Sequence, residues 1–182
     1  MTDQKTNEQE ELVCIQDGCK YPKNPPWSPV VTKLTSLWIL IFFLAGVYGT
    51  LKVGFSVFFI WTLIFCIKLY VIRYIVCARC PYYGENCSCF YGKLAARLFE
   101  KQENKSMKMG LWIDCFVWYF IFLYPLYYYL KLDMDVYAMF WVFLFFAMSG
   151  TLSVLACSTC PFEFCPQGYV GRIVGKIMGL RK

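Results

Sequence analysis

The hydrophobic positions of this chain fall into four long runs separated by polar stretches. The runs cover residues 34–51, 55–76, 111–130 and 136–156 and carry few charged side chains. A helix needs about 20 apolar residues to cross the hydrocarbon of a bilayer, so each run predicts a transmembrane helix. Only short turns separate the first run from the second and the third from the fourth. The pattern therefore predicts an all-α integral membrane fold built from two helical hairpins.

The two hairpins form an internal repeat. When the chain is displaced by 80 residues, residues 34–81 align with the second half without a gap. The alignment pairs Trp38 with Trp118 and Trp61 with Trp141, and both halves then reach the motif Cys-x-x-Cys-Pro. Because each repeat has two spans, both copies enter the membrane in the same orientation. Both cysteine motifs are therefore expected at one face of the membrane.

A short basic segment follows each cysteine motif. Apolar side chains recur at helical spacing in residues 90–99 and 169–178, with lysine and arginine off that face. Such a helix is typical of the headgroup region of a bilayer, although its apolar face could instead pack on a soluble partner. The chain thus divides into an N-terminal tail over residues 1–33, a first repeat over 34–109 and a second repeat over 110–182.

Composition supports a membrane location and suggests an orientation. The chain is 59% hydrophobic and 16% charged, whereas soluble domains carry about 25% charged residues. Lysine and arginine concentrate in the tail, the middle loop and the C-terminal segment, but each hairpin turn holds one lysine, Lys52 or Lys131. By the positive-inside rule, both termini and both cysteine regions are expected in the cytoplasm. The net charge of +6 suits lipid headgroups or an acidic partner, and nothing indicates nucleic-acid binding.

A few side chains inside the spans call for separate predictions. Lys68 and Arg73 lie in the last half of the second run, where long basic side chains can reach the headgroups. Asp114 near the start of the third run is a possible partner for Lys68. Cys66 and Cys115 have no cysteine at the matching position of the other repeat, so they are expected to be small apolar fillers.

The remaining cysteines are the candidate chemical groups. The chain has eleven cysteines and no histidine, which removes the usual general base and mixed cysteine–histidine zinc sites. The cytoplasm keeps thiols reduced, so metal binding or redox chemistry is favoured over structural disulfides. The candidate ligands are Cys77, Cys80, Cys87 and Cys89 in the first region, Cys157, Cys160 and Cys165 in the second, and Cys14 and Cys19 in the proline-rich tail.

These cysteines could bind metal in two alternative arrangements. In the favoured one, the first region holds one metal centre alone, and the second region completes its own with Cys14 or Cys19. In the other, a single site is shared by the two Cys-x-x-Cys pairs, namely Cys77, Cys80, Cys157 and Cys160. The first is favoured because both repeats retain a third cysteine that a shared site would leave unused. All-thiolate ligation suits an iron–sulfur cluster and zinc alike, and redox dithiols or palmitoylated cysteines are the alternatives to metal.

Three functional hypotheses follow from this interpretation. The favoured one is a membrane anchor or electron-transfer subunit that carries iron–sulfur centres and docks a soluble or membrane protein on its cytoplasmic face. The second is a structural zinc-binding scaffold, and the third is a thiol oxidoreductase or a transporter of soft metals. The sequence contains no glycine-rich phosphate loop and, without histidine, no Ser/His/Asp triad. An electron-relay or non-catalytic role is therefore expected rather than an independent enzyme.

Overall fold

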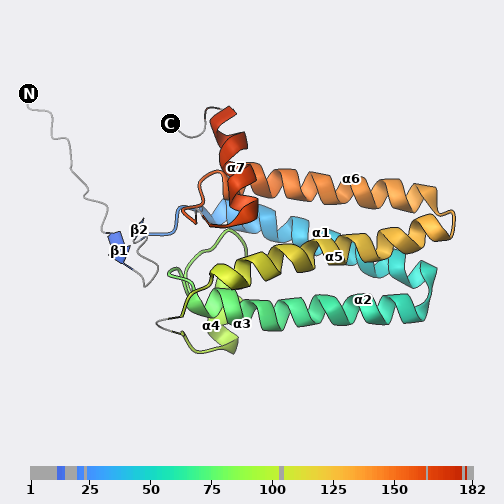
Figure 1. Cartoon of the computed structure of the whole chain (residues 1–182), viewed down its shortest axis with the longest axis horizontal. Coiled ribbons are helices and arrows are strands. Elements are labelled where there is room, and N and C mark those ends of the chain that lie inside the picture. The colour runs from blue at the N-terminus through green and yellow to red at the C-terminus, as the bar shows by residue number, and fades with distance from the viewer. Residues whose placement is uncertain are drawn as a thin grey trace, which may run out of the picture.

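The computed structural model describes residues 12–14, 20–22, 24–102, 105–162, 164–177 and 179. Four long helical segments pack side by side into one bundle, and the short helices α4 and α7 lie at the same end of it (Figure 1). The elements are β1 Leu12–Cys14, β2 Lys20–Pro22, α1 Pro29–Val53, α2 Phe55–Ile67, the π-helical turn η1 Lys68–Ile72, α3 Arg73–Val76, the 3-10 turn η2 Cys77–Arg79, α4 Tyr91–Leu98, α5 Lys108–Lys131, α6 Asp135–Leu152, the π-helical turn η3 Ser153–Cys157 and α7 Pro166–Ile177.

The prediction of four membrane-spanning helices is confirmed at the level of length and composition. Four helical segments are long and apolar enough to cross a bilayer: Pro29–Val53, Phe55–Arg79, Lys108–Lys131 and Asp135–Cys157. Many of their largest apolar side chains point outward, among them Phe55, Phe116 and Val136, each more than 70% exposed. Such an apolar outer surface is stable in lipid and unfavourable in water.

Local chemistry sets where the first hairpin begins and turns. Helix α1 starts at Pro29, five residues before the apolar run, because the Ser28 hydroxyl accepts a hydrogen bond from the Val31 amide and proline suits the first helical position. The hairpin turns at Gly54, whose φ of 154° and ψ of 156° are available almost only to glycine. The two helices therefore reverse direction across a single residue.

Aromatic side chains fill the centre of the bundle. The Phe42 and Trp141 rings stack at 4.4 Å between centroids, and Trp61 meets Trp141 edge to face at 6.3 Å. Both buried indoles donate hydrogen bonds to backbone carbonyls of α5: Trp61 to Ile121 at 3.0 Å and Trp141 to Phe122 at 2.9 Å. These bonds matter because a buried indole N–H without a partner is costly in an apolar core.

The start of α1 holds both cysteine regions at one end of the bundle, which we call the thiol end. The Thr32 hydroxyl donates to the Cys87 carbonyl at 2.6 Å, and the buried Thr35 hydroxyl donates to the Ser88 carbonyl. Just before the helix, the Trp27 indole donates to the Ala156 carbonyl at 2.9 Å. The first turns of α1 thus fix the first cysteine loop, while Trp27 fixes the second.

The N-terminal tail departs from a simple proline-rich loop. Strands β1 and β2 pair antiparallel, with Cys14 opposite Lys20 in the register. Cys14 therefore lies in a short strand whose side chains are not described, and Cys19 lies outside the described residues. The predicted part of these two cysteines in a second metal site stays a prediction.

Candidate thiol site

The two Cys-x-x-Cys motifs adopt the same turn. The amide of Cys80 donates to the carbonyl of Cys77 at 3.3 Å, and the amide of Cys160 donates to the carbonyl of Cys157 at 3.3 Å. Each turn directly follows a membrane span. All nine cysteines whose side chains are described carry unoxidised thiols.

The sulfurs of the first region divide between two environments. Cys77 and Cys89 belong to the bundle core, where both lie within electrostatic range of the Arg73 guanidinium. Cys80 and Cys87 instead join a separate apolar cluster at the thiol end that also contains Cys160. The two environments adjoin, because Cys87 lies within electrostatic range of Cys77, Cys80 and Cys89.

Tyr82 marks the place where the two regions meet. Its ring is 2% exposed and contacts Trp27 and Phe162 edge-on or tilted, at 5.7 and 6.0 Å between centroids. Burial, and to a smaller extent the neighbouring sulfurs of Cys80 and Cys160, raise the pKa of Tyr82 to about 12. Burial likewise raises the pKa of Cys160 to about 12. One sulfur from each Cys-x-x-Cys motif thus lies near the same buried phenol.

The described sulfurs do not fit a preformed metal centre. Within the described ranges, no three cysteine, aspartate or glutamate side chains converge closely enough to hold an ion. Neither four sulfurs of the first region nor the two Cys-x-x-Cys pairs come together in this way. A metal centre at these positions would require the sulfurs to move together, and it stays a prediction.

Two pairs of cysteine side chains nevertheless lie close enough to influence each other's ionisation. They are Cys87 with Cys89, and Cys115 with Cys165. The neighbouring Cys89 thiol lowers the pKa of Cys87 to about 6, and the neighbouring Cys115 thiol lowers the pKa of Cys165 to about 6. The Cys115–Cys165 pair joins α5 to the loop before α7, so it links segments far apart in the chain.

The N-terminus of α7 faces this second pair. The backbone amide of Gln167 lies near the sulfurs of both Cys115 and Cys165 and favours their thiolate forms, and the amide of Gly168 does the same for Cys165. Unpaired amides at a helix start stabilise negative charge, and thiolates at such positions are typically reactive. The expectation that Cys115 is an apolar filler stays untested, but its thiol lies near that of Cys165. Its position near the thiol end of the third span was the one signal that could have shown this.

Glycines allow α7 to approach the second Cys-x-x-Cys turn. A Cβ atom at Gly171 would overlap the side chain of Cys157 and lie 2.8 Å from its carbonyl carbon, and one at Gly175 would lie 3.1 Å from the Ser158 Cβ. Gly168, one turn earlier, is buried at the same interface. This close packing fixes the position of α7 against the turn and so places its first backbone amides near Cys115 and Cys165.

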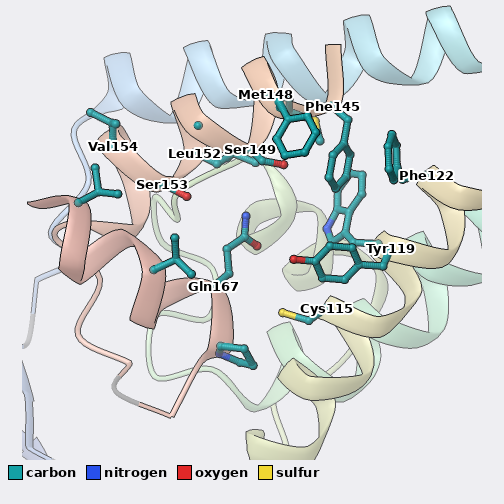
Figure 2. Close-up of a pocket in the computed structure, with 16 residues that line it drawn as sticks. Cys115, Tyr119, Phe122, Phe145, Met148, Ser149, Leu152, Ser153, Val154 and Gln167 are labelled. Atoms are coloured by element: carbon teal, nitrogen blue, oxygen red, sulfur yellow. The ribbon is translucent and has the colours of Figure 1, made fainter. Parts of the chain in front are cut away.

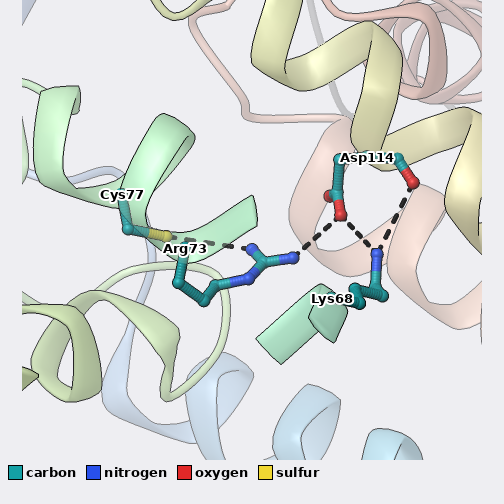
Figure 3. A network of polar contacts seen from close by, with 4 residues as sticks. All are labelled: Lys68, Arg73, Cys77 and Asp114. Atoms are coloured by element: carbon teal, nitrogen blue, oxygen red, sulfur yellow. Dashed lines mark hydrogen bonds and ion pairs between the residues drawn. The ribbon is translucent and has the colours of Figure 1, made fainter. Parts of the chain in front are cut away.

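A buried ion network lies beside the first region (Figure 3). The Asp114 carboxylate pairs with the ammonium of Lys68 and with the guanidinium of Arg73, the latter at 2.9 Å. The predicted pairing of Lys68 with Asp114 is confirmed. The expectation that Lys68 and Arg73 reach the headgroups is wrong, because their residues are 0% and 5% exposed.

Aromatic rings and one thiol complete the environment of the two cations. The Lys68 ammonium lies 4.2 Å from the centre of the Trp118 ring, and the Arg73 guanidinium lies 4.1 Å from that of Tyr91. Arg73 also donates a hydrogen bond to the Cys77 sulfur at 3.8 Å. Lys68 and Arg73 exceed Asp114 by one positive charge, so the network can stabilise a thiolate at Cys77.

A cavity of about 630 Å³ opens next to the Cys115–Cys165 pair, between α5, the α6–η3 segment and α7 (Figure 2). Most of its wall is aromatic or aliphatic. The polar exceptions are Cys115, Ser149, Ser153 and Gln167. Figure 2 shows the Cys115 sulfur and the Gln167 amide turned toward the same space.

Comparisons with protein-family models, with curated proteins and with solved structures found no match to this chain. Its function is therefore argued from the geometry of the site alone.

Proposed function

We propose that this protein is a membrane-embedded thiol oxidoreductase that uses Cys115 and Cys165 as its redox pair. The observation that supports this most strongly is the proximity of these two thiols, which come from separate elements and both lie near the backbone amide of Gln167. A reactive dithiol needs two adjacent sulfurs, one of them stabilised as a thiolate and accessible. Cys115 and Cys165 are both partly exposed.

The proposed reaction is thiol–disulfide exchange with a partner protein. The Cys165 thiolate attacks one sulfur of a partner disulfide, the partner S–S bond breaks, and the departing sulfur takes up a proton. Cys115 then loses its proton and attacks the Cys165 sulfur, which closes the Cys115–Cys165 disulfide and releases the second partner thiol. Two electrons pass to the partner, whose two thiols take one proton from Cys115 and one from solvent, and the reverse sequence oxidises a partner dithiol.

The orientation follows from the distribution of basic residues. Lysine and arginine predominate in the loops at the thiol end, whereas each hairpin turn at the other end holds one lysine. Both termini and the thiol end therefore face the cytoplasm. Helices α4 and α7 lie in the headgroup region, since apolar side chains of α7 such as Tyr169 and Ile177 are 62% and 80% exposed.

A second candidate is the membrane anchor or electron-transfer subunit with a thiolate-bound iron–sulfur cluster, or zinc in a scaffold. It is supported by the excess positive charge of Lys68 and Arg73 over Asp114 beside Cys77, which suits an anionic thiolate centre. The sulfurs as arranged do not form that centre, so this candidate ranks second. The basic thiol end would dock the soluble or membrane partner in either case.

Disulfide mapping in full-length protein reconstituted in nanodiscs tests the primary proposal. Mild oxidation with diamide, followed by alkylation and peptide mass spectrometry, should yield a Cys115–Cys165 disulfide that a reductant reopens. Cys66 is the matched control, because it also lies in a span but is exposed on the bundle surface; Cys66→Ser should leave the disulfide unchanged. Separate alkylation of Cys115 and Cys165 after oxidation would overturn the proposal.

For the second candidate, anaerobic purification should give stoichiometric iron with an EPR signal, or stoichiometric zinc, and a metal-free folded protein would exclude it.

A further inference from the structure

The cavity beside the redox pair is open to lipid and large enough for a ligand. Its volume of about 630 Å³ lies within the range of small-molecule sites, about 300–1,000 Å³. Among its lining residues, Tyr119 and Phe146 are 60% and 64% exposed on the outer surface of their spans. A ligand dissolved in the bilayer can therefore enter sideways, without passing through water.

The lining suits a flat ring with polar oxygens better than an acyl chain. Aromatic side chains from α5 and α6 form one wall, namely Trp118, Tyr119, Phe122 and Phe145. Stacking against a planar ring is the preferred contact of such side chains. At the thiol end, Ser149, Ser153 and Gln167 add hydroxyl and amide groups that can hydrogen-bond to carbonyl oxygens. An acyl chain would use none of these polar groups.

The redox pair gives this ring a chemical role. Cys115 lines the cavity, and its thiol lies close enough to that of Cys165 for the two to influence each other's ionisation. Resting on the oxidoreductase function proposed above, we infer that the cavity binds a lipid-soluble quinone that accepts electrons from the Cys115–Cys165 dithiol. The Cys115 S–H bond breaks, and one S–S bond forms between Cys115 and the Cys165 thiolate. The two electrons and the Cys115 proton pass to the quinone, which takes a second proton from solvent because Cys165 starts as a thiolate, and its carbonyl oxygens become the hydroxyls of a quinol.

Gly150 offers a way to close the cavity without disturbing the sulfurs. It lines the space on α6, and a Cβ placed there would meet nothing within 4 Å. Gly150→Phe should therefore fill the cavity and weaken quinone binding by about tenfold or more, the loss expected when an aromatic contact is denied. Cys115→Ser should retain binding and lose electron transfer, and Cys66→Ser should match the parent protein.

The test uses full-length protein in nanodiscs and the short-chain quinone decylubiquinone. Binding is followed by quenching of tryptophan fluorescence, and chemistry by quinol formed per protein together with disulfide mapping. The expected result is one quinol for each Cys115–Cys165 disulfide, with the variant pattern given above.

The outcomes separate this inference from the function on which it rests. If diamide closes the disulfide but decylubiquinone neither binds nor reacts, the quinone assignment is overturned and the oxidoreductase stands. If neither oxidant closes it, both are overturned. Equal quinone binding by Gly150→Phe would place the ligand elsewhere and also overturn the inference. Copurified phospholipid that the quinone cannot displace would identify an acyl chain as the occupant and have the same effect.

Discussion

Removing the carboxylate of Asp114 should destabilise the bundle more than any other single charge change. In Asp114→Asn, the amide can still accept hydrogen bonds, but Lys68 and Arg73 lose their counter-charge while remaining buried. Removing one partner of a buried ion pair leaves an uncompensated charge and costs about 3–5 kcal/mol. The cation–π contacts of Lys68 with Trp118 and of Arg73 with Tyr91 offset part of this, so the expected loss is about 3 kcal/mol.

Unfolding of the reconstituted protein in SDS, followed by tryptophan fluorescence, measures this loss. Asp135→Asn is the control, because Asp135 is exposed in the first turn of α6 and its charge contributes less than about 1 kcal/mol through the helix dipole. The double variant Asp114→Asn, Lys68→Met should recover part of the stability, since it removes one of the two unpaired cations. Strict additivity of the two changes, or an Asp114→Asn loss no larger than that of the control, would refute a coupled buried network.

Two further predictions concern packing. Gly171→Ala should destabilise the protein by about 1–3 kcal/mol through overpacking against Cys157 and lower the yield of the Cys115–Cys165 disulfide. Gly150→Ala, the control, should be neutral or stabilising because a Cβ there meets no neighbouring atom. Similar results for the two variants in SDS unfolding and disulfide mapping would contradict this prediction. Trp61→Phe should lower the free energy of unfolding in SDS by about 1–3 kcal/mol, because the Ile121 carbonyl loses its indole donor. Trp112→Phe is the control, since that residue is 61% exposed. An equal loss in both variants would contradict the role of the Trp61 hydrogen bond.

Sequence patterns were sufficient to predict the spans and part of the ion network. Uncharged runs of the right length leave few alternatives to membrane helices, and α2 begins at Phe55 as its run does. The pairing of Lys68 with Asp114 followed because a charge inside a span needs a partner near its own depth. The burial of Arg73 could not be predicted, because its long side chain can either reach the headgroups or fold into the bundle. Its contacts with Asp114 and Tyr91 favour burial, and these contacts depend on the packing of the helices.

The sulfur pairs could not be predicted from spacing. A soluble helix reveals its buried face by a polar stripe, but α5 is apolar around most of its circumference, so its rotation about its own axis cannot be read from the sequence. That rotation decides whether Cys115 faces lipid or Cys165. Cysteine spacing predicted one metal-binding group of sulfurs per repeat, whereas no three of the described sulfurs converge closely enough to hold an ion.

A redox titration of the full-length protein tests the central claim most directly. The fraction of Cys165 in the oxidised form, measured by alkylation and mass spectrometry in a series of glutathione buffers, should rise in a single two-electron transition with a slope of about 30 mV per decade. The account predicts that Cys115→Ser abolishes this transition and that Cys66→Ser leaves its midpoint unchanged. A transition that persists in Cys115→Ser, or none at any accessible potential, would contradict it.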